Sequence, residues 1–146
     1  MSVFCVPDLK NRSFELEVER KMRASPSALY VAWTRQFDRW FAAPGSVLMQ
    51  GATDTPYFFE TVYEDQRHPH YGRFLRLTPD RLVELTWVTG QGGTAGAETV
   101  VTVGLSPQAA GTLLHLRHAG FPDEASRKQH ADAWPLVLEQ MDARIG

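Results

Sequence analysis

The sequence contains a single cysteine, Cys5, among its 146 residues, so no intramolecular disulfide can form. Cys5 precedes every predicted strand and has no histidine at a defined spacing, so we do not expect a catalytic thiol. The first ten residues have neither the basic start nor the apolar core of a secretion signal. Together these absences favour a reducing compartment, and we expect a cytoplasmic protein.

Long hydrophobic runs and an excess of one charge are also missing. No stretch approaches the roughly 18 consecutive apolar residues of a membrane-spanning helix, so we expect no membrane partner. Fifteen Lys and Arg oppose seventeen Asp and Glu, which gives a net charge of −2 and argues against a general nucleic-acid binder. With no repeats or linkers, the length predicts a single domain over 1–146, with a folded core over about 14–145.

The chain has instead a clear succession of strand and helix patterns. Residues 14–22 alternate between apolar and polar side chains, which predicts a half-buried strand. Ser25-Pro26 then predicts a helix start, followed by two short helices over 28–34 and around 37–41. Turn-forming residues separate six further predicted strands, over 47–50, 56–64, 71–78, 81–89, 98–105 and 112–119.

The last segment, 122–145, predicts a long helix. Trp134, Leu138, Met141 and Ile145 recur at helical spacing and form an apolar stripe. Pro135 removes a backbone donor, so we expect a kink near 131–134 or two abutting helices. The short connections between strands favour antiparallel pairing. The pattern predicts an α+β fold in which a curved antiparallel sheet of about seven strands wraps a long C-terminal helix, with two short helices between strands 1 and 2.

Several groups of residues, in this order and spacing, resemble one known superfamily. They are Ala24-Ser25-Pro26, Leu29-Tyr30 with Ala32-Trp33-Thr34, Arg39-Trp40-Phe41 with Pro44-Gly45, Arg81-Leu82-Val83 ending at Trp87, Leu114-x-Leu116-x-His118 with Gly120-Phe121-Pro122, and Trp134 before Leu138. The chain resembles SRPBCC/START-like (Bet v 1-like) proteins, and within them the branch named after the activator of the heat-shock-protein-90 ATPase. The resemblance covers nearly the whole chain.

What the resemblance implies is a helix-grip fold with a cavity between the sheet and the long helix. Members of the superfamily bind varied apolar or amphipathic small molecules, and a minority catalyse reactions without a catalytic set common to the branch. The sequence departs from the pattern at 51–57, where many members have a Gly-Gly-aromatic element, and in the polar segment 64–70. Both departures concern the mouth of the expected cavity.

Six residues are candidates for binding a ligand in that cavity: Trp40, Phe41, Trp87, Leu116, His118 and Trp134. Four are aromatic and fall on faces predicted to be buried, where some would line a cavity. Leu116 and His118 continue the inward row that begins at Leu114. A histidine that ends an apolar row is more often a satisfied core residue, and the alternatives are a polar anchor for a ligand or a general base.

Other patterns favour structural interpretations, and we expect neither a metal nor a cofactor. His68 and His70 lie in a predicted loop without a third ligand, and we expect surface histidines. His115 and His118 are three apart in a strand and point to opposite faces. The segment 90–95 matches the letters G-x-G-x-x-A, but a strand follows it where a dinucleotide site needs a helix, so it predicts a hairpin loop.

Arg20 continues the inward row of the first strand, and a buried guanidinium must be paired. Glu60, Glu84 and Glu98 are the candidate partners, and the sequence does not choose among them. A structural ion pair is the preferred interpretation of this arginine over a ligand contact.

Three functions remain open at this stage. The first is the binding of a small apolar or amphipathic molecule, and the second is a chaperone-linked protein-interaction module. The third is an enzyme that uses His118 or a carboxylate in the cavity. A homodimer is compatible with each of them. A large pocket would favour binding, its absence would favour interaction, and converging titratable groups would favour catalysis.

Overall fold

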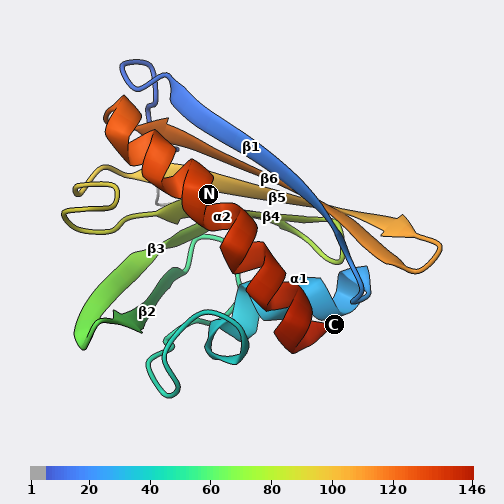
Figure 1. The fold of residues 1–146 in the computed structure, drawn as a ribbon. Helices are drawn as coiled ribbons and strands as arrows, with labels where there is room; N and C mark the ends of the chain where they lie inside the picture. Colours follow the sequence, from blue (N-terminus) through green and yellow to red (C-terminus); the bar gives the residue numbers. More distant parts are fainter. Residues whose placement is uncertain (1–5) are drawn as a thin grey trace.

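The structure is a computed structural model that describes residues 6–146, so Cys5 lies outside the described residues (Figure 1). The elements are β1 (Phe14–Met22), α1 (Pro26–Arg35), the 3₁₀ helix η1 (Phe37–Arg39), β2 (Pro56–Tyr63), β3 (Gln66–Thr78), β4 (Leu82–Trp87), β5 (Thr99–Gln108), β6 (Gly111–Phe121) and α2 (Glu124–Ile145). The strands form an antiparallel sheet in the order β1-β6-β5-β4-β3-β2, and α2 crosses one face of it. The predicted α+β helix-grip class is confirmed, with six strands rather than seven.

The predicted strand over 47–50 is the one that does not form. Only Leu48 in this segment pairs with β2, through two backbone hydrogen bonds of 2.8 and 2.9 Å with Phe58. The side chain of Leu48 is 70% exposed. Val47 and Met49 are half-buried against the core, but the single bridge at Leu48 is the one ladder contact of this segment with the sheet, so it does not form a strand.

The hairpin of β2 and β3 is tighter than the sequence predicts. Its turn consists of Glu64 and Asp65, whose φ angles are 52° and 62°, and the strands pair directly from Tyr63 and Gln66. Two residues at positive φ are typical of a two-residue hairpin turn, but Glu-Asp is not its usual sequence. The expected loop over 65–70 is therefore wrong beyond Asp65, because residues 66–70 belong to β3.

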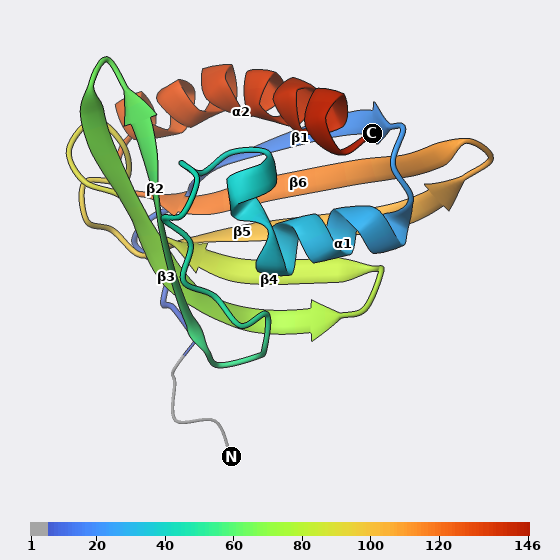
Figure 2. The same ribbon diagram turned by 90° about the horizontal axis from the view of Figure 1, so that it is seen from below.

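β3 changes partner part-way along its length. Its first half pairs with β2, and its second half pairs with β4 from Phe74 onward. Gly72 lies at the change, where a Cβ atom would come within 2.4 Å of the backbone oxygen of Thr86. Only glycine allows so close a crossing. The hairpin end of β2 and β3 bends out of the main sheet toward the N-terminal end of α2 (Figure 2).

α2 runs without interruption from Glu124 to Ile145, although it contains Pro135. The prediction of two abutting helices is therefore wrong. Pro135 is on the exposed side of the helix, where water can satisfy the carbonyl group that loses its partner. Asp123 caps the start by accepting a hydrogen bond of 2.8 Å from the backbone of Ser126.

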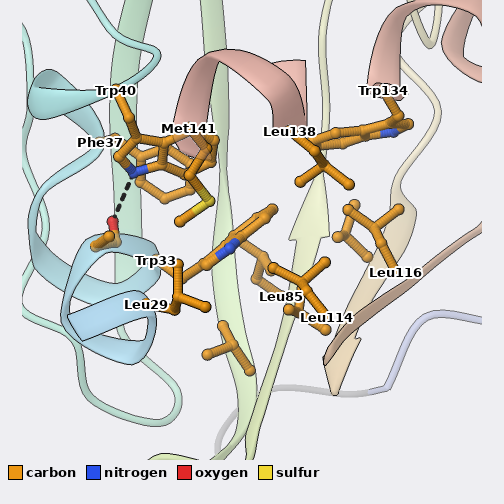
Figure 3. Close-up of a cluster of buried hydrophobic side chains, with 14 of the residues drawn as sticks. Leu29, Trp33, Phe37, Trp40, Leu85, Leu114, Leu116, Trp134, Leu138 and Met141 are labelled. Carbon is orange, nitrogen blue, oxygen red and sulfur yellow. Dashed lines mark hydrogen bonds between the residues drawn. The ribbon is translucent and has the colours of Figure 1, made fainter. Parts of the chain in front are cut away.

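Under the C-terminal half of α2 the core is filled. Leu138 and Met141 are fully buried, as the stripe predicts, and face the rings contributed by α1, η1 and the residue that follows η1 (Figure 3). The ring of Trp33 lies 4.9 Å from that of Trp40, centroid to centroid. Trp40 also donates a hydrogen bond of 2.9 Å to the carbonyl group of Ala32, which fixes its orientation.

Arg20 pairs with none of the three predicted carboxylates. Its guanidinium lies 3.6 Å from Asp142 in the last turns of α2. Each of the predicted partners is held by an arginine of β3 instead, in the pairs Glu60–Arg67, Glu84–Arg76 and Glu98–Arg73. The prediction is wrong because α2 brings a carboxylate from the far end of the sequence to the end of β1.

Candidate ligand-binding pocket

A half-open cavity of about 610 Å³ lies beside the N-terminal half of α2. Three elements surround it: α2 over 129–137, the bent hairpin of β2 and β3, and the loop between β4 and β5. Phe41, from the segment after η1, completes the wall. The pocket is thus built where the hairpin diverges from the main sheet.

The inner wall of the pocket is aromatic. Phe41, Trp87 and Trp134 contribute rings from three separate parts of the chain. The rings of Trp87 and Trp134 lie 5.3 Å apart, and those of Phe41 and Trp87 lie 6.2 Å apart in a stacked arrangement. Val137 and Ala133 extend this apolar surface along α2. Such a wall favours apolar and aromatic ligands.

Of the six candidate residues, Phe41, Trp87 and Trp134 line the pocket. Trp40, Leu116 and His118 do not line it, because they are fully buried in the core behind it. Trp40 is separated from the pocket by Phe41, against which it stacks at 5.8 Å. The structure therefore brings the six residues into one region but divides them between wall and core.

His118 has a hydrogen-bond partner for each ring nitrogen. Trp134 donates from Nε1 to Nδ1 of His118 at 3.0 Å, so this nitrogen carries no proton. Nε2 then donates to the hydroxyl group of Thr99 at 2.7 Å, and that hydroxyl donates to the carbonyl group of Trp87 at 2.5 Å. Burial holds the pKa of His118 well below its ordinary value. Both ring nitrogens of His118 are thus satisfied within the core.

His70 is one of the polar residues that line the pocket. It is only 8% exposed, and its ring stacks on Phe59 at 4.8 Å. Nδ1 lies 3.0 Å from the carbonyl oxygen of His68 and must donate to it, because a carbonyl group can only accept. Burial lowers the pKa of His70 from 6.5 to about 4, so the ring is neutral at pH 7 and Nε2 carries a lone pair.

His130 reaches the pocket from the opposite side, on α2. Its Nδ1 donates to the carbonyl oxygen of Ser126 at 2.8 Å, one helical turn earlier. Burial lowers its pKa, so this imidazole too is neutral at pH 7. Two neutral imidazoles, from two different elements, therefore contribute to the pocket wall.

Charge is scarce at the pocket. No aspartate or glutamate is among the residues of the described chain that line it, and Arg67 is their only Lys or Arg. Arg67 is 79% exposed and lies 3.7 Å from Glu60, so its charge is at the rim and is compensated. The interior thus offers neutral acceptors and apolar rings rather than an ion-binding site.

Residues 23–146 match the family described as "Activator of Hsp90 ATPase homolog 1-like protein". The chain belongs to this family. The match spans α1, the whole route from η1 to β6, and α2, so it includes every element that lines the pocket. No protein with a curated description matches the chain.

Solved structures of similar fold accompany the family match. Protein CV1439 from Chromobacterium violaceum is 22% identical, with a TM-score of 0.77 over 90% of this chain and 96% of that chain. CalU16 from Micromonospora echinospora is 22% identical, with a TM-score of 0.69 over 90% and 76%. The Aha1 dimer from Colwellia psychrerythraea is 14% identical, with a TM-score of 0.66 over 90% and 95%. At these identities the likeness shows the fold alone.

The remaining sequence patterns have structural outcomes. The segment 90–95 is a loop between β4 and β5, as predicted, and Ser126 donates a hydrogen bond of 2.5 Å from α2 to the carbonyl group of Gly93 in it. His118 is buried whereas His115 lies near Glu17 on the other face, which confirms their opposite orientation.

Within residues 6–146, no group of three or more His, Cys, Asp or Glu side chains could hold a metal ion. Likewise, none of the described helices is both long and apolar enough to cross a bilayer.

The prediction of a loop is wrong for both His68 and His70, and the prediction of a surface histidine is wrong for His70. Both lie on β3, where residues two apart point to the same side, and His70 is buried. Apolar and polar residues alternate only weakly over 66–71, so the sequence gives little indication of a strand there. The strand forms because the short turn at Glu64-Asp65 pairs these residues with β2. His130 was not among the candidates, because its place on the pocket depends on which face α2 presents to the hairpin.

Proposed function

We propose that this chain binds a small, largely apolar molecule in the pocket between α2, the β2–β3 hairpin and the β4–β5 loop. The observation that carries the proposal is the pocket itself, whose volume of about 610 Å³ is typical of small-molecule sites. An aromatic inner wall with a few neutral polar groups supports a ligand that is mostly apolar and is oriented by one or two hydrogen bonds.

The alternatives have less support. A general base needs a nitrogen that can take a proton from the substrate, and both nitrogens of His118 are engaged in the core. No carboxylate from the described residues lines the pocket. A chaperone-linked interaction module rests on the name of the family, whereas the pocket is a feature of this chain. The geometry therefore favours binding over the other two functions.

The proposal is tested by filling the pocket from its rim. Ala133 lines the pocket from an exposed position of α2, so Ala133→Trp should occupy the space without disturbing the core. Ala143→Trp is a matched control at an exposed position of the same helix that does not line the pocket. The probe is N-phenyl-1-naphthylamine, an uncharged dye whose fluorescence rises in apolar surroundings. We expect Ala133→Trp to weaken its binding at least tenfold and Ala143→Trp to leave it unchanged.

Two results would count against the proposal. If Ala133→Trp binds the dye as the wild type does, the dye is not in this pocket. If a broad set of apolar probes finds no binder, and native mass spectrometry of freshly purified protein finds no retained small molecule, the pocket does not act as a binding site. The protein-interaction module would then be the better-supported function.

We also infer that the chain forms a homodimer, and the dimeric Aha1 protein from Colwellia psychrerythraea supports this through its similar fold. Light scattering coupled to size-exclusion chromatography would test it. A mass of one chain across the working concentration range would contradict it. A cytoplasmic location stays a prediction from the sequence.

A further inference from the structure

We propose that the ligand is an aromatic molecule with a hydroxyl group on its ring, and that this hydroxyl group donates a hydrogen bond to Nε2 of His70. The inference deepens the proposed function and rests on it. It assigns His70 as the residue that orients the ligand, and a phenol-like or naphthol-like compound as the class that is recognised.

The first argument is that His70 Nε2 is an unused acceptor in the wall of the pocket. The other nitrogen, Nδ1, is committed to the carbonyl group of His68, which fixes the tautomer and leaves the lone pair on Nε2. Among residues 6–146 no hydrogen-bond partner is found for Nε2. The buried polar atoms that lack both a partner and solvent access do not include Nε2. The atom therefore keeps access to the pocket that His70 lines.

The second argument is the contrast with His118, which is fully buried in the core behind the pocket. The protein satisfies both nitrogens of that buried imidazole with Trp134 and Thr99. A buried acceptor without a partner costs free energy, which is why buried polar groups are nearly always paired. At His70 the protein satisfies one nitrogen only, and the other faces the pocket, where water can donate to it. A ligand that displaces this water must itself donate a hydrogen bond, or it leaves the acceptor unpaired.

The third argument concerns the part of the ligand that surrounds the donor. The ring of His70 is itself set among aromatic side chains, with Phe41 at 5.4 Å and Trp87 at 5.2 Å in edge-to-face arrangements. A flat aromatic ligand that reaches Nε2 would contact these rings, which pair favourably with other aromatic rings. The donor and the aromatic ring must therefore be parts of one molecule.

The fourth argument concerns the charge of the ligand. A cation would find no carboxylate among the described residues of the wall. An anion would meet the lone pair of His70 unless the ring took up a proton, and burial opposes that protonation by lowering the pKa of His70 to about 4. A neutral donor is the remaining class, and a ring hydroxyl group is a stronger donor than an aliphatic one.

The test uses three probes of similar size: naphthalene, 2-naphthol and 2-methoxynaphthalene. At pH 7 all three are neutral, and only 2-naphthol can donate. By isothermal titration calorimetry we expect wild-type protein to bind 2-naphthol about tenfold more tightly than either of the other two, since a hydrogen bond to an otherwise unpaired buried acceptor is worth about this factor. Naphthalene controls for the bulk of the methoxy group.

The variant His70→Phe keeps a ring against Phe59 but removes the acceptor. We expect its three dissociation constants to differ by less than about twofold, with naphthalene bound as in the wild type. His70→Gln places an amide oxygen near the former Nε2 and should restore part of the preference. His115→Phe removes an imidazole on the outer face of the sheet and should leave the preference unchanged. Circular dichroism would check that each variant is folded.

The outcomes separate this inference from the proposed function. If the wild type binds all three probes equally, or if His70→Phe retains the preference for 2-naphthol, the role of His70 is wrong while the pocket still binds ligands. If none of the probes binds and Ala133→Trp has no effect on the dye, both proposals fail together.

Discussion

The two halves of α2 cover the same sheet, yet one covers a filled core and the other a hollow. Under the C-terminal half, Leu138 and Met141 are fully buried and belong to the same core cluster as the aromatic side chains of α1 and η1. Beside the N-terminal half the neighbour is the β2–β3 hairpin, which bends away and leaves about 610 Å³. The comparison teaches that the stripe of one helix does not decide whether the space beneath it is filled. The neighbouring elements decide it.

Two buried histidines near the hollow differ in how their ring nitrogens are satisfied. Behind the pocket wall, His118 has both ring nitrogens engaged, one by Trp134 and one by Thr99. At the hollow, His70 has one nitrogen engaged and one open. The same type of side chain is thus a core residue in one place and a ligand contact in our proposal for the other.

The largest effect should come from the filled half. Leu138→Ala removes a fully buried side chain whose space the surrounding rings cannot close, so we expect a loss of about 2–5 kcal/mol in the free energy of unfolding. Urea unfolding monitored by tryptophan fluorescence measures it. A loss below about 0.5 kcal/mol would mean that this half is not packed as described.

A smaller effect should come from pH, because the three imidazoles with lowered pKa values, His70, His118 and His130, lie in or behind the pocket wall. His70 is neutral in the folded protein down to about pH 4, whereas in the unfolded chain it takes up a proton near pH 6.5. The unfolded state therefore binds more protons between these values, and stability falls as the pH falls. We expect His70 alone to lower the free energy of unfolding by about 2 kcal/mol between pH 7 and pH 5.

The lowered pKa values of His118 and His130 act in the same direction. Urea unfolding at pH 7, 6 and 5 would measure the total slope, and His70→Phe should make it shallower. Leu138→Ala, in contrast, should lower the whole curve without changing its slope. A pH-independent stability over this range would show that these imidazoles are solvated.

The smallest effect on stability should come from Val137→Ala. Val137 is next to Leu138 in sequence but lines the hollow and is only half-buried. Its removal enlarges an existing space instead of opening a new one, so we expect a loss below about 1 kcal/mol in urea unfolding. Binding of N-phenyl-1-naphthylamine should nevertheless weaken. A loss equal to that of Leu138→Ala would erase the distinction between the two halves.

The sequence alone determined the class of fold and most of its elements. The alternation over 14–22, the stripe of Trp134, Leu138 and Met141, and the short turns between strands each reflect a local period, and local periods are readable without a structure. The family was likewise recognisable from the order of short motifs along the chain. The same patterns placed three of the six candidate residues on the pocket wall.

Only the tertiary structure decided where the space is and which polar atoms face it. Arg20 pairs with Asp142, 122 positions later in the sequence, and His70 and His130 reach one pocket from a strand and a helix. These relations depend on the bend that Gly72 allows in β3 and on the face that α2 presents to the hairpin. They are contacts between residues distant in sequence, which the local preferences of either partner do not encode, and so no reading of one segment at a time could reveal them.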